Sequence, residues 1–256
     1  MSGTPELTEK RYWDEFWDNV TLPARVDLNF SNDFYISNIL KKYLPPIKDA
    51  PALEVGCAPG KWMVFLWENF GYQVDGCEYL ESASKKTAEN LELCGINNFS
   101  IYTCDFLQMD PGTRKYNVVI SLGFIEHFEN PDLVINKQVD LLEKGGFLVI
   151  GIPKLTGLNY FIARQLDKYT DNKLVPNHNL TIMHKRYLDN LQIHCKKIFV
   201  NTIGGFEPAL FDVSKCPRWQ KYVFLLINLI FNNEFFRKLN LGFYSGYLIG
   251  IYEKNG

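Results

Sequence analysis

From residue 50 onward, short apolar runs alternate with amphipathic, helix-like segments along the chain. The runs with strand character cover residues 52–55, 71–78, 100–104, 116–121, 147–150, 196–203 and 246–252. Helical patterns follow Gly60 and cover residues 82–94, where Gly95 provides a stop, and residues 133–142. Strands and helices that alternate in this way predict an α/β fold with a doubly wound, mostly parallel sheet.

The N-terminal segment, residues 1–45, carries two helical patterns ahead of the first strand. The first contains two aromatic pairs spaced to share one helix face, Tyr12-Trp13 and Phe16-Trp17. The second covers residues 32–44 and ends at Pro45-Pro46, because proline cannot continue a helix. The aromatic helix is interpreted either as packed on the domain or as a helical flap over a binding site.

A second unusual segment, residues 206–243, separates the last two strands. It contains an apolar run at residues 222–231. This run is too short to cross a bilayer, which needs about 20 residues. A buried helix or substrate lid, a dimer surface and an interfacial membrane patch are the three interpretations that remain open.

Composition places the 256 residues in one globular domain that covers the whole chain. The net charge of -2 gives no electrostatic reason to expect a nucleic-acid partner. The six cysteines include no CxxC pair, which argues against a zinc knuckle or a redox motif. The first eleven residues are polar and lack the apolar core of a signal peptide. We therefore expect a cytoplasmic protein with reduced thiols.

The most informative stretch is the strand, glycine turn and helix around residues 52–67. A dinucleotide-binding turn would need glycine at positions 56, 58 and 61, but this chain has Ala58 and Lys61. The missing glycines argue against a pyrophosphate at the start of the helix. Glu54, inside the strand just before the turn, suits a cationic ligand instead.

This turn resembles the first motif of the class I S-adenosylmethionine-dependent methyltransferases. That motif is an acidic residue, a variable residue and Gly-x-Gly-x-Gly, matched by Glu54, Gly56 and Gly60, with Ala58 in place of the middle glycine. Further segments follow in the order that the family requires. The resemblance implies a Rossmann-like, seven-stranded sheet whose last strand is antiparallel, and S-adenosyl-L-methionine as cofactor with S-adenosyl-L-homocysteine as product. Residues 50–153 would form the cofactor-binding core.

Two carboxylates follow later strands of this core. Glu78 closes the second strand, where a carboxylate can accept both ribose hydroxyls of a nucleoside. Asp105 follows the third strand, where the family places an acidic residue on the adenine amino group, and Phe106 could pack on the adenine face. Each carboxylate has a simpler interpretation: Glu78 as a solvated strand end, and Asp105 as a turn former.

The loop after the fourth strand resembles the family's fourth motif through its Glu-His-Phe run, residues 126–128. The backbone of Ser121 and Leu122 would face the methionine part of the cofactor. The expected cofactor-binding residues are Glu54, Gly56, Cys57, Ala58, Gly60, Glu78, Tyr79, Asp105, Phe106, Ser121 and Leu122.

Two histidines are candidates for catalysis. A neutral imidazole at His127 could take the acceptor's proton as the methyl group transfers, or it could bond a backbone group across the loop. His178 lies in residues 154–195, an acceptor-side segment whose layout looks like that of methyltransferases in bacterial surface-glycan and small-metabolite pathways. It could reach the acceptor or lie in an ordinary exposed loop. No pattern in the chain requires a metal.

The reaction expected is in-line methyl transfer to a small-molecule or glycan-type acceptor, by positioning and exclusion of water. One alternative is a cofactor-binding but non-catalytic partner subunit that uses residues 206–243 as its interaction surface. Another is a nicotinamide-dependent reductase, although a Tyr-x-x-x-Lys proton donor is not evident. Homodimerisation or peripheral membrane contact would involve residues 220–241, and no nucleic-acid partner is expected.

Overall fold

The computed structural model describes Trp13, Trp17 and residues 20–256, apart from residues 171, 172, 209, 210, 232 and 240 and the side chains of residues 234, 237 and 238. Trp13 and Trp17 both lie in helical conformation. The other two aromatic residues of the expected N-terminal face, Tyr12 and Phe16, lie outside the described residues.

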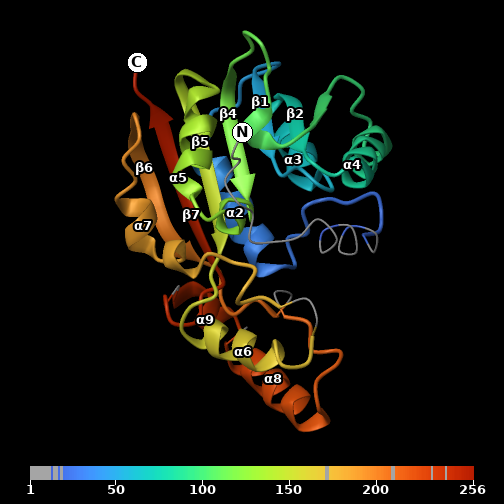
Figure 1. Cartoon of the computed structure of the whole chain (residues 1–256), viewed down its shortest axis with the longest axis vertical. Coiled ribbons are helices and arrows are strands. Elements are labelled where there is room, and N and C mark those ends of the chain that lie inside the picture. The colour runs from blue at the N-terminus through green and yellow to red at the C-terminus, as the bar shows by residue number, and fades with distance from the viewer. Residues whose placement is uncertain are drawn as a thin grey trace.

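A seven-stranded sheet forms the centre of the molecule, in the order β3-β2-β1-β4-β5-β7-β6 (Figure 1). Its strands are β1 (Pro51–Val55), β2 (Gln73–Glu78), β3 (Ser100–Thr103), β4 (Tyr116–Leu122), β5 (Leu142–Pro153), β6 (Cys195–Ile203) and β7 (Tyr247–Lys254). The first five strands pair in parallel, and β7 runs antiparallel between β5 and β6. The doubly wound, Rossmann-like sheet with an antiparallel last strand is therefore confirmed.

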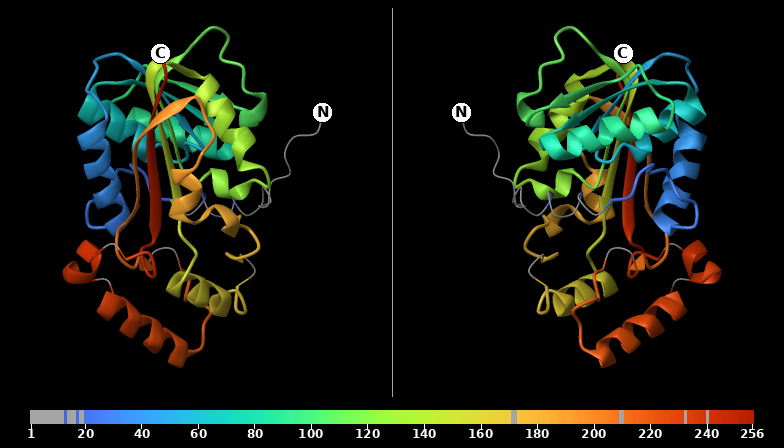
Figure 2. Two further views of the ribbon diagram at one scale, coloured as in Figure 1. Left: turned by 90° about the vertical axis from the view of Figure 1, so that its left-hand side faces the viewer. Right: turned by 90° about the vertical axis from the view of Figure 1, so that its right-hand side faces the viewer.

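Helices cover both faces of this sheet (Figure 2). They are α2 (Ser31–Tyr43), α3 (Lys61–Phe70), α4 (Glu81–Leu93), α5 (Pro131–Asp140), α6 (Leu158–Leu166), α7 (Lys185–Asp189), α8 (Arg218–Phe231) and α9 (Glu234–Leu239). Apolar side chains of α2 and α3 build one core cluster with the sheet, and those of α5 build a second cluster on the other face. Both faces of the central strands are thus buried, as the continuous apolar runs predicted.

The helix expected over residues 133–142 differs from α5 at both ends. It begins two residues earlier, because Pro131 occupies its first turn and the side chain of Asn130 accepts a hydrogen bond from the N–H of Leu133. It ends at Asp140, because Leu142 pairs with Tyr116 and already belongs to β5. Strand pairing thus overrides the helical pattern at this end.

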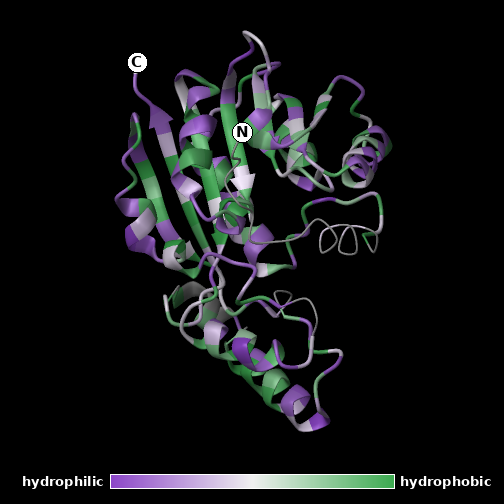
Figure 3. Cartoon of the chain, in the orientation of Figure 1, coloured by the Kyte–Doolittle hydropathy of each residue, from purple (hydrophilic) through white to green (hydrophobic). Residues whose placement is uncertain are grey.

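Between β6 and β7, α8 and α9 lie with α6 beyond one end of the sheet (Figures 1 and 2). The expected helical insertion is therefore present, but the interpretation of α8 as a buried helix is wrong. Phe224 is the buried residue of α8, whereas Tyr222 is 70% and Leu229 is 75% exposed. Green, apolar positions along α8 alternate with polar ones in Figure 3. Within the described part of the chain, no helix combines the length and apolar character needed to cross a membrane.

A buried hydrogen-bonded cluster around Asn159 and Lys154 connects this insertion to the end of β5. The side-chain amide of Asn159 donates to the carbonyls of Lys154, Tyr244 and Ser245 at 3.0, 3.2 and 3.2 Å. The ammonium group of Lys154 donates to the carbonyl of Gly242. Burial lowers the pKa of Lys154 to about 8, from the usual 10.5. The cluster therefore contains a lysine whose positive charge reduces the stability of the folded protein.

Replacing Lys154 by methionine tests this cost through the pH dependence of stability. Between pH 8 and 10.5 the unfolded chain binds the lysine proton more tightly than the folded one. The stability of the native protein, relative to Lys154→Met, should therefore rise as the pH increases through this window. Urea unfolding of both proteins from pH 7 to pH 10.5 measures the difference. Lys168→Met, which removes an exposed lysine, is the matched control, and a difference independent of pH would contradict the prediction.

Candidate active site

A cavity of about 470 Å³ lies at the carboxyl ends of the parallel strands. Its wall includes the turn after β1, the end of β2, the first residues after β3 and the loop after β4. Nine residues expected from the sequence line it: Glu54, Gly56, Ala58, Glu78, Tyr79, Asp105, Phe106, Leu122 and His127. Four others do not line it: Cys57, Gly60, Ser121 and His178. The switch point of the sheet, where such folds bind ligands, is thus also the hollow part of this molecule.

Two glycines shape the turn between β1 and α3. Gly56 has a φ of +70°, and a Cβ at this position would lie 2.7 Å from the ring of Phe124. Gly60, at the start of α3, has a φ of +87°. Ala58 does not adopt the left-handed conformation, so alanine is accommodated where the family motif has its middle glycine. The turn therefore has glycine at positions 56 and 60, where the backbone is left-handed.

Glu54 presents an unsatisfied carboxylate at the end of β1. The residue is 4% exposed, and its Oε2 atom has no hydrogen-bond partner in the described part of the chain. Burial raises the pKa of Glu54 well above its usual range, against the opposing effects of the Lys61 charge and the N–H of Met63. A buried acceptor without a donor is costly, and a cationic ligand in the cavity would relieve this cost. The residue therefore fits the amino group of S-adenosylmethionine.

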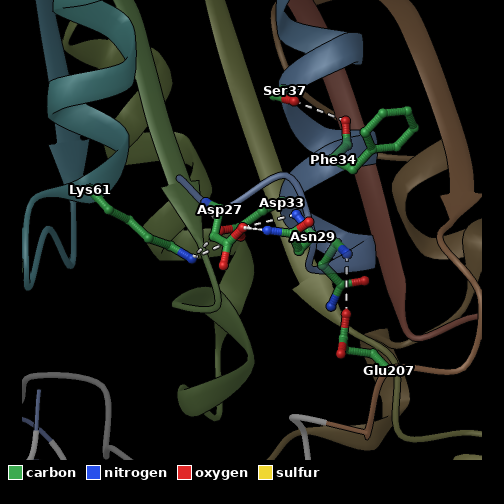
Figure 4. Close-up of polar contacts among 8 residues, drawn as sticks. Asp27, Asn29, Asp33, Phe34, Ser37, Lys61 and Glu207 are labelled. Carbon is green, nitrogen blue, oxygen red and sulfur yellow. Dashed lines mark hydrogen bonds and ion pairs between the residues drawn. The ribbon is translucent and has the colours of Figure 1, made fainter. Parts of the chain in front are cut away.

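Lys61 also lines the cavity, although the sequence indicated it only as a departure from the dinucleotide pattern. Its ammonium group lies 2.8 and 2.9 Å from the two carboxylate oxygens of Asp33 in α2 (Figure 4). Asp33 also accepts the N–H of Asp27 at 3.1 Å. The ion pair with Asp33 therefore directs the Lys61 ammonium group toward α2. Nothing in the local sequence could have located Asp33, which lies 28 residues away.

The carboxylates of Glu78 and Asp105 both border the cavity but have structural contacts as well. Glu78 is 5% exposed and accepts the N–H of Leu80 at 3.1 Å. Asp105 accepts the N–H of Leu107 at 2.9 Å and the side-chain amide of Gln108 at 3.2 Å. The turn-forming role that was the alternative for Asp105 is therefore present. Its contact with an adenine remains a prediction.

Aromatic side chains supply most of the apolar wall. Phe124 packs between Phe106 and Phe128, with ring centroids 6.0 and 5.0 Å apart. Trp13 meets the ring of His127 edge to face at 4.8 Å and stacks on Trp17 at 6.3 Å. Phe128 belongs to the Glu-His-Phe run noted in the sequence, whereas Phe124 had no distinctive pattern, because it is one phenylalanine in an apolar loop. Together these rings form an apolar wall that suits planar or apolar groups.

The expected binding residues that do not line the cavity support it from behind. The thiol of Cys57 packs against Gly76, where an added Cβ would come within 2.5 Å of the sulfur. The hydroxyl of Ser121 is buried and donates to the side-chain carbonyl of Gln138 at 3.1 Å. These side chains therefore point away from the ligand space, and any contact with the cofactor would come from their backbone.

His127 and His178 lie side by side, with ring centroids 4.6 Å apart. Nδ1 of His127 is 3.0 Å from the carbonyl of Asn177, and Nδ1 of His178 is 2.7 Å from that of Leu174. Burial lowers the pKa of His127 to about 3, with a smaller contribution from His178. An imidazole with so low a pKa is a weak base at neutral pH. Catalysis by His127 stays a prediction, and this environment disfavours it.

Comparison with known proteins agrees with the geometry of this site. Residues 52–146 match the family model of a methyltransferase domain. This match begins in β1 and ends in β5, so it includes the glycine turn and the carboxylates of Glu54, Glu78 and Asp105. The matched segment is therefore the part of the chain that builds most of the cavity.

Individual proteins show the same relationship. The chain is 28% identical over 140 residues to EEF1A lysine methyltransferase 2 from Mus musculus, covering 52% of this chain and 55% of that one. It is 25% identical over 171 residues to a tRNA U34 carboxymethyltransferase from Desulfotalea psychrophila, covering 61% of this chain and 50% of that one. The chain thus spans about half the length of these two relatives.

A solved structure extends the likeness to the whole fold. A protein from Galdieria sulphuraria, proposed to be a sarcosine dimethylglycine methyltransferase, superposes with a TM-score of 0.61 at 15% identity, covering 96% of this chain and 97% of that one. The family match, the sheet order and the cavity at its switch point lead to one conclusion. Residues 52–146 are similar to the methyltransferase-domain family, and the whole chain has the Rossmann-like fold of the class I S-adenosylmethionine-dependent methyltransferases.

Proposed function

We propose that this protein transfers the methyl group of S-adenosylmethionine to an acceptor that enters the cavity beside His127. The observation that carries the proposal is the convergence of Glu54 and Glu78 on one cavity next to the glycine turn. When bound, the cofactor supplies an electrophilic sulfonium methyl, so the protein need not generate a strong electrophile. The protein's task is to bind, to orient and to exclude water.

Each part of the cavity has a distinct task in this proposal. Glu54 would accept a hydrogen bond from the cofactor's amino group with Oε2, which has no partner among the described residues. Glu78 would accept the ribose hydroxyls, and Phe106 would pack against the adenine. The rings of Phe124 and Phe128 keep water away from the reacting atoms.

The N-terminal segment would act as the flap. Trp13 and Trp17 line the cavity, and they also pack against Ala58, Leu80 and Ala83 on the cofactor side. The ammonium group of Lys86 in α4 donates to the carbonyl of Trp17 at 2.6 Å, which ties this segment to the domain. Bound cofactor would therefore be covered by residues that arrive from outside the family match.

A small molecule is our first candidate for the acceptor, because the cavity of about 470 Å³ is walled in part by aromatic rings. A protein lysine is the second, favoured by the similarity to EEF1A lysine methyltransferase 2. The expectation that nucleic acid is excluded has lost its support, because another relative is a tRNA U34 carboxymethyltransferase. The net charge of -2 is a property of the whole chain and does not describe one face.

Isothermal titration with S-adenosylhomocysteine tests the cofactor assignment. The native protein should bind it in preference to NADH, and Glu78→Gln should bind it about tenfold more weakly, because a charge-assisted hydrogen bond contributes about 1.5–3 kcal/mol. Glutamine can still accept the N–H of Leu80, so the fold is preserved. Glu81→Gln, at an exposed position three residues along, is the control. Preference for NADH would refute the assignment.

The flap is tested by its tryptophans. Trp13→Ala should weaken the binding of S-adenosylhomocysteine several-fold, because a large apolar ring is removed from the cavity wall. Trp219→Ala removes a 63% exposed tryptophan from α8 and should leave the affinity unchanged. Equal affinities of the native protein and both variants would show that the N-terminal segment does not cover the cofactor.

The acceptor class is tested with cofactor that carries a radioactive methyl group. The protein is incubated separately with a low-molecular-weight metabolite extract, with a total protein extract and with total tRNA. We expect label in the metabolite fraction, and Glu54→Gln as a cofactor-site control should abolish it. Label in protein or in tRNA instead would replace the small-molecule candidate. Cofactor binding without transfer to any fraction would favour the non-catalytic partner subunit.

A further inference from the structure

A buried cluster of three potential metal ligands lies at one edge of the cavity. It consists of Glu126, His127 and His178, whose ligand atoms all lie within 4.8 Å of one another. Glu126 is 0% exposed, and neither of its carboxylate oxygens has a hydrogen-bond partner among the residues that the structure describes. Burying a carboxylate in this way is costly unless a cation or a donor joins it. The cluster is therefore incomplete as it stands.

Both histidines are oriented as metal ligands are. Nδ1 of His127 and Nδ1 of His178 each face a backbone carbonyl, at 3.0 and 2.7 Å. A carbonyl oxygen can only accept, so each Nδ1 carries the proton and the lone pair of each ring is on Nε2. Metal-binding histidines almost always donate their other N–H to such an oxygen, which fixes the tautomer and the direction of the ring.

The backbone around the cluster is held in place by contacts between the two loops. The N–H of Asn179 donates to the carbonyl of Glu126 at 2.7 Å. The side-chain amide of Asn179 donates to the carbonyl of Phe128 at 3.2 Å. Together with the bond from His127 to Asn177, these contacts fasten the turn after β4 to the loop that carries His178. The three ligand residues are thus brought together by the fold, as a preorganised site requires.

We propose that Glu126, His127 and His178 bind one divalent transition-metal ion, with Zn²⁺ as the best-matched species. Two nitrogens and one carboxylate form a set typical of open, catalytic zinc sites. Ligand atoms about 2.1 Å from a tetrahedral ion are about 3.4 Å apart. Nε2 of His127 and Oε1 of Glu126 are already 3.6 Å apart, so small side-chain rotations close the site. No spacing pattern in the sequence indicated this metal site.

The location of the site adds a role that rests on the proposed methyl transfer. His127 lines the cavity, so an ion bound to it would lie at the cavity wall. An ion there would bind an oxygen of the acceptor in its open position. The metal site itself does not depend on this role.

Zinc binding to the metal-free full-length protein is the test. After treatment with EDTA, the protein should bind one Zn²⁺ per chain by equilibrium dialysis with elemental analysis, and Mg²⁺ more weakly. Glu126→Gln and His178→Ala should each weaken Zn²⁺ binding at least tenfold. His184→Ala is the matched control, because it removes an exposed histidine six residues beyond His178.

Two further measurements make the result decisive. Unchanged affinity for S-adenosylhomocysteine in Glu126→Gln would show that the cavity is intact, so that lost zinc binding belongs to the ligand set. X-ray absorption should show nitrogen and oxygen neighbours without sulfur. Zinc held by cysteine thiols, equal zinc affinity in all the variants, or no stoichiometric binding would each overturn the metal site. The proposed methyl transfer is judged separately, by cofactor binding to the metal-free protein and by the assay with the labelled methyl group.

Discussion

A carboxylate buried with one oxygen unsatisfied among the described residues is the constraint on which this site depends. Glu54 is the next-to-last residue of β1, the strand between β2 and β4, and its neighbours Leu53 and Val55 are fully buried. Because both faces of this strand are covered, turning it would not bring Glu54 to water, and pulling Leu53 and Val55 out of the core would cost about 1.5–3 kcal/mol for each. The apolar strand therefore holds the carboxylate at the cavity against its own preference for solvent.

The same principle operates on the other side of the cavity, by different means. Glu126 is held by a short 3-10 turn, Ile125–His127, whose backbone is hydrogen-bonded to the loop around Asn179. The side proposed for the cofactor is thus fixed by the sheet, and the side proposed for the acceptor is fixed by contacts between two loops. In a methyltransferase this division fits the chemistry, because the cofactor is constant within the family while acceptors differ. Loops can change without disturbing the sheet.

The fold could be predicted because its signals are local. Each strand carries its own apolar run, and Glu78 and Asp105 could be placed because parallel strands deliver their ends to one edge. Contacts between distant segments have no such local signal. Lys61 in α3 pairs with Asp33 in α2, and His178 lies near Glu126 although α5, β5 and α6 separate them in the sequence. The pairing of such residues is decided by tertiary packing, so their spacing in the sequence carries no period that could be detected.

The character of α8 was also outside the reach of a local pattern. Its apolar run indicated burial, but only one side of the helix packs on the core, through Phe224 with the partly buried Ile227 and Phe231. The opposite side exposes Leu225 and Leu229. Apolar content reports how much surface could be buried and does not report how much the fold covers. Whether an apolar helix face is buried depends on which other elements pack against it, and only the assembled structure shows this.

The two uses considered for His127 exclude each other, and this bears on the acceptor. A lone pair given to an ion is not available for a proton, so a metal-bound His127 cannot act as the base. A positive ion at the cavity wall would attract an acceptor oxygen and lower its pKa, whereas it would repel a lysine ammonium. Zinc at this cluster would therefore favour an oxygen acceptor over a protein lysine. Whether the cluster holds an ion thus decides, through electrostatics, which class of acceptor the cavity favours.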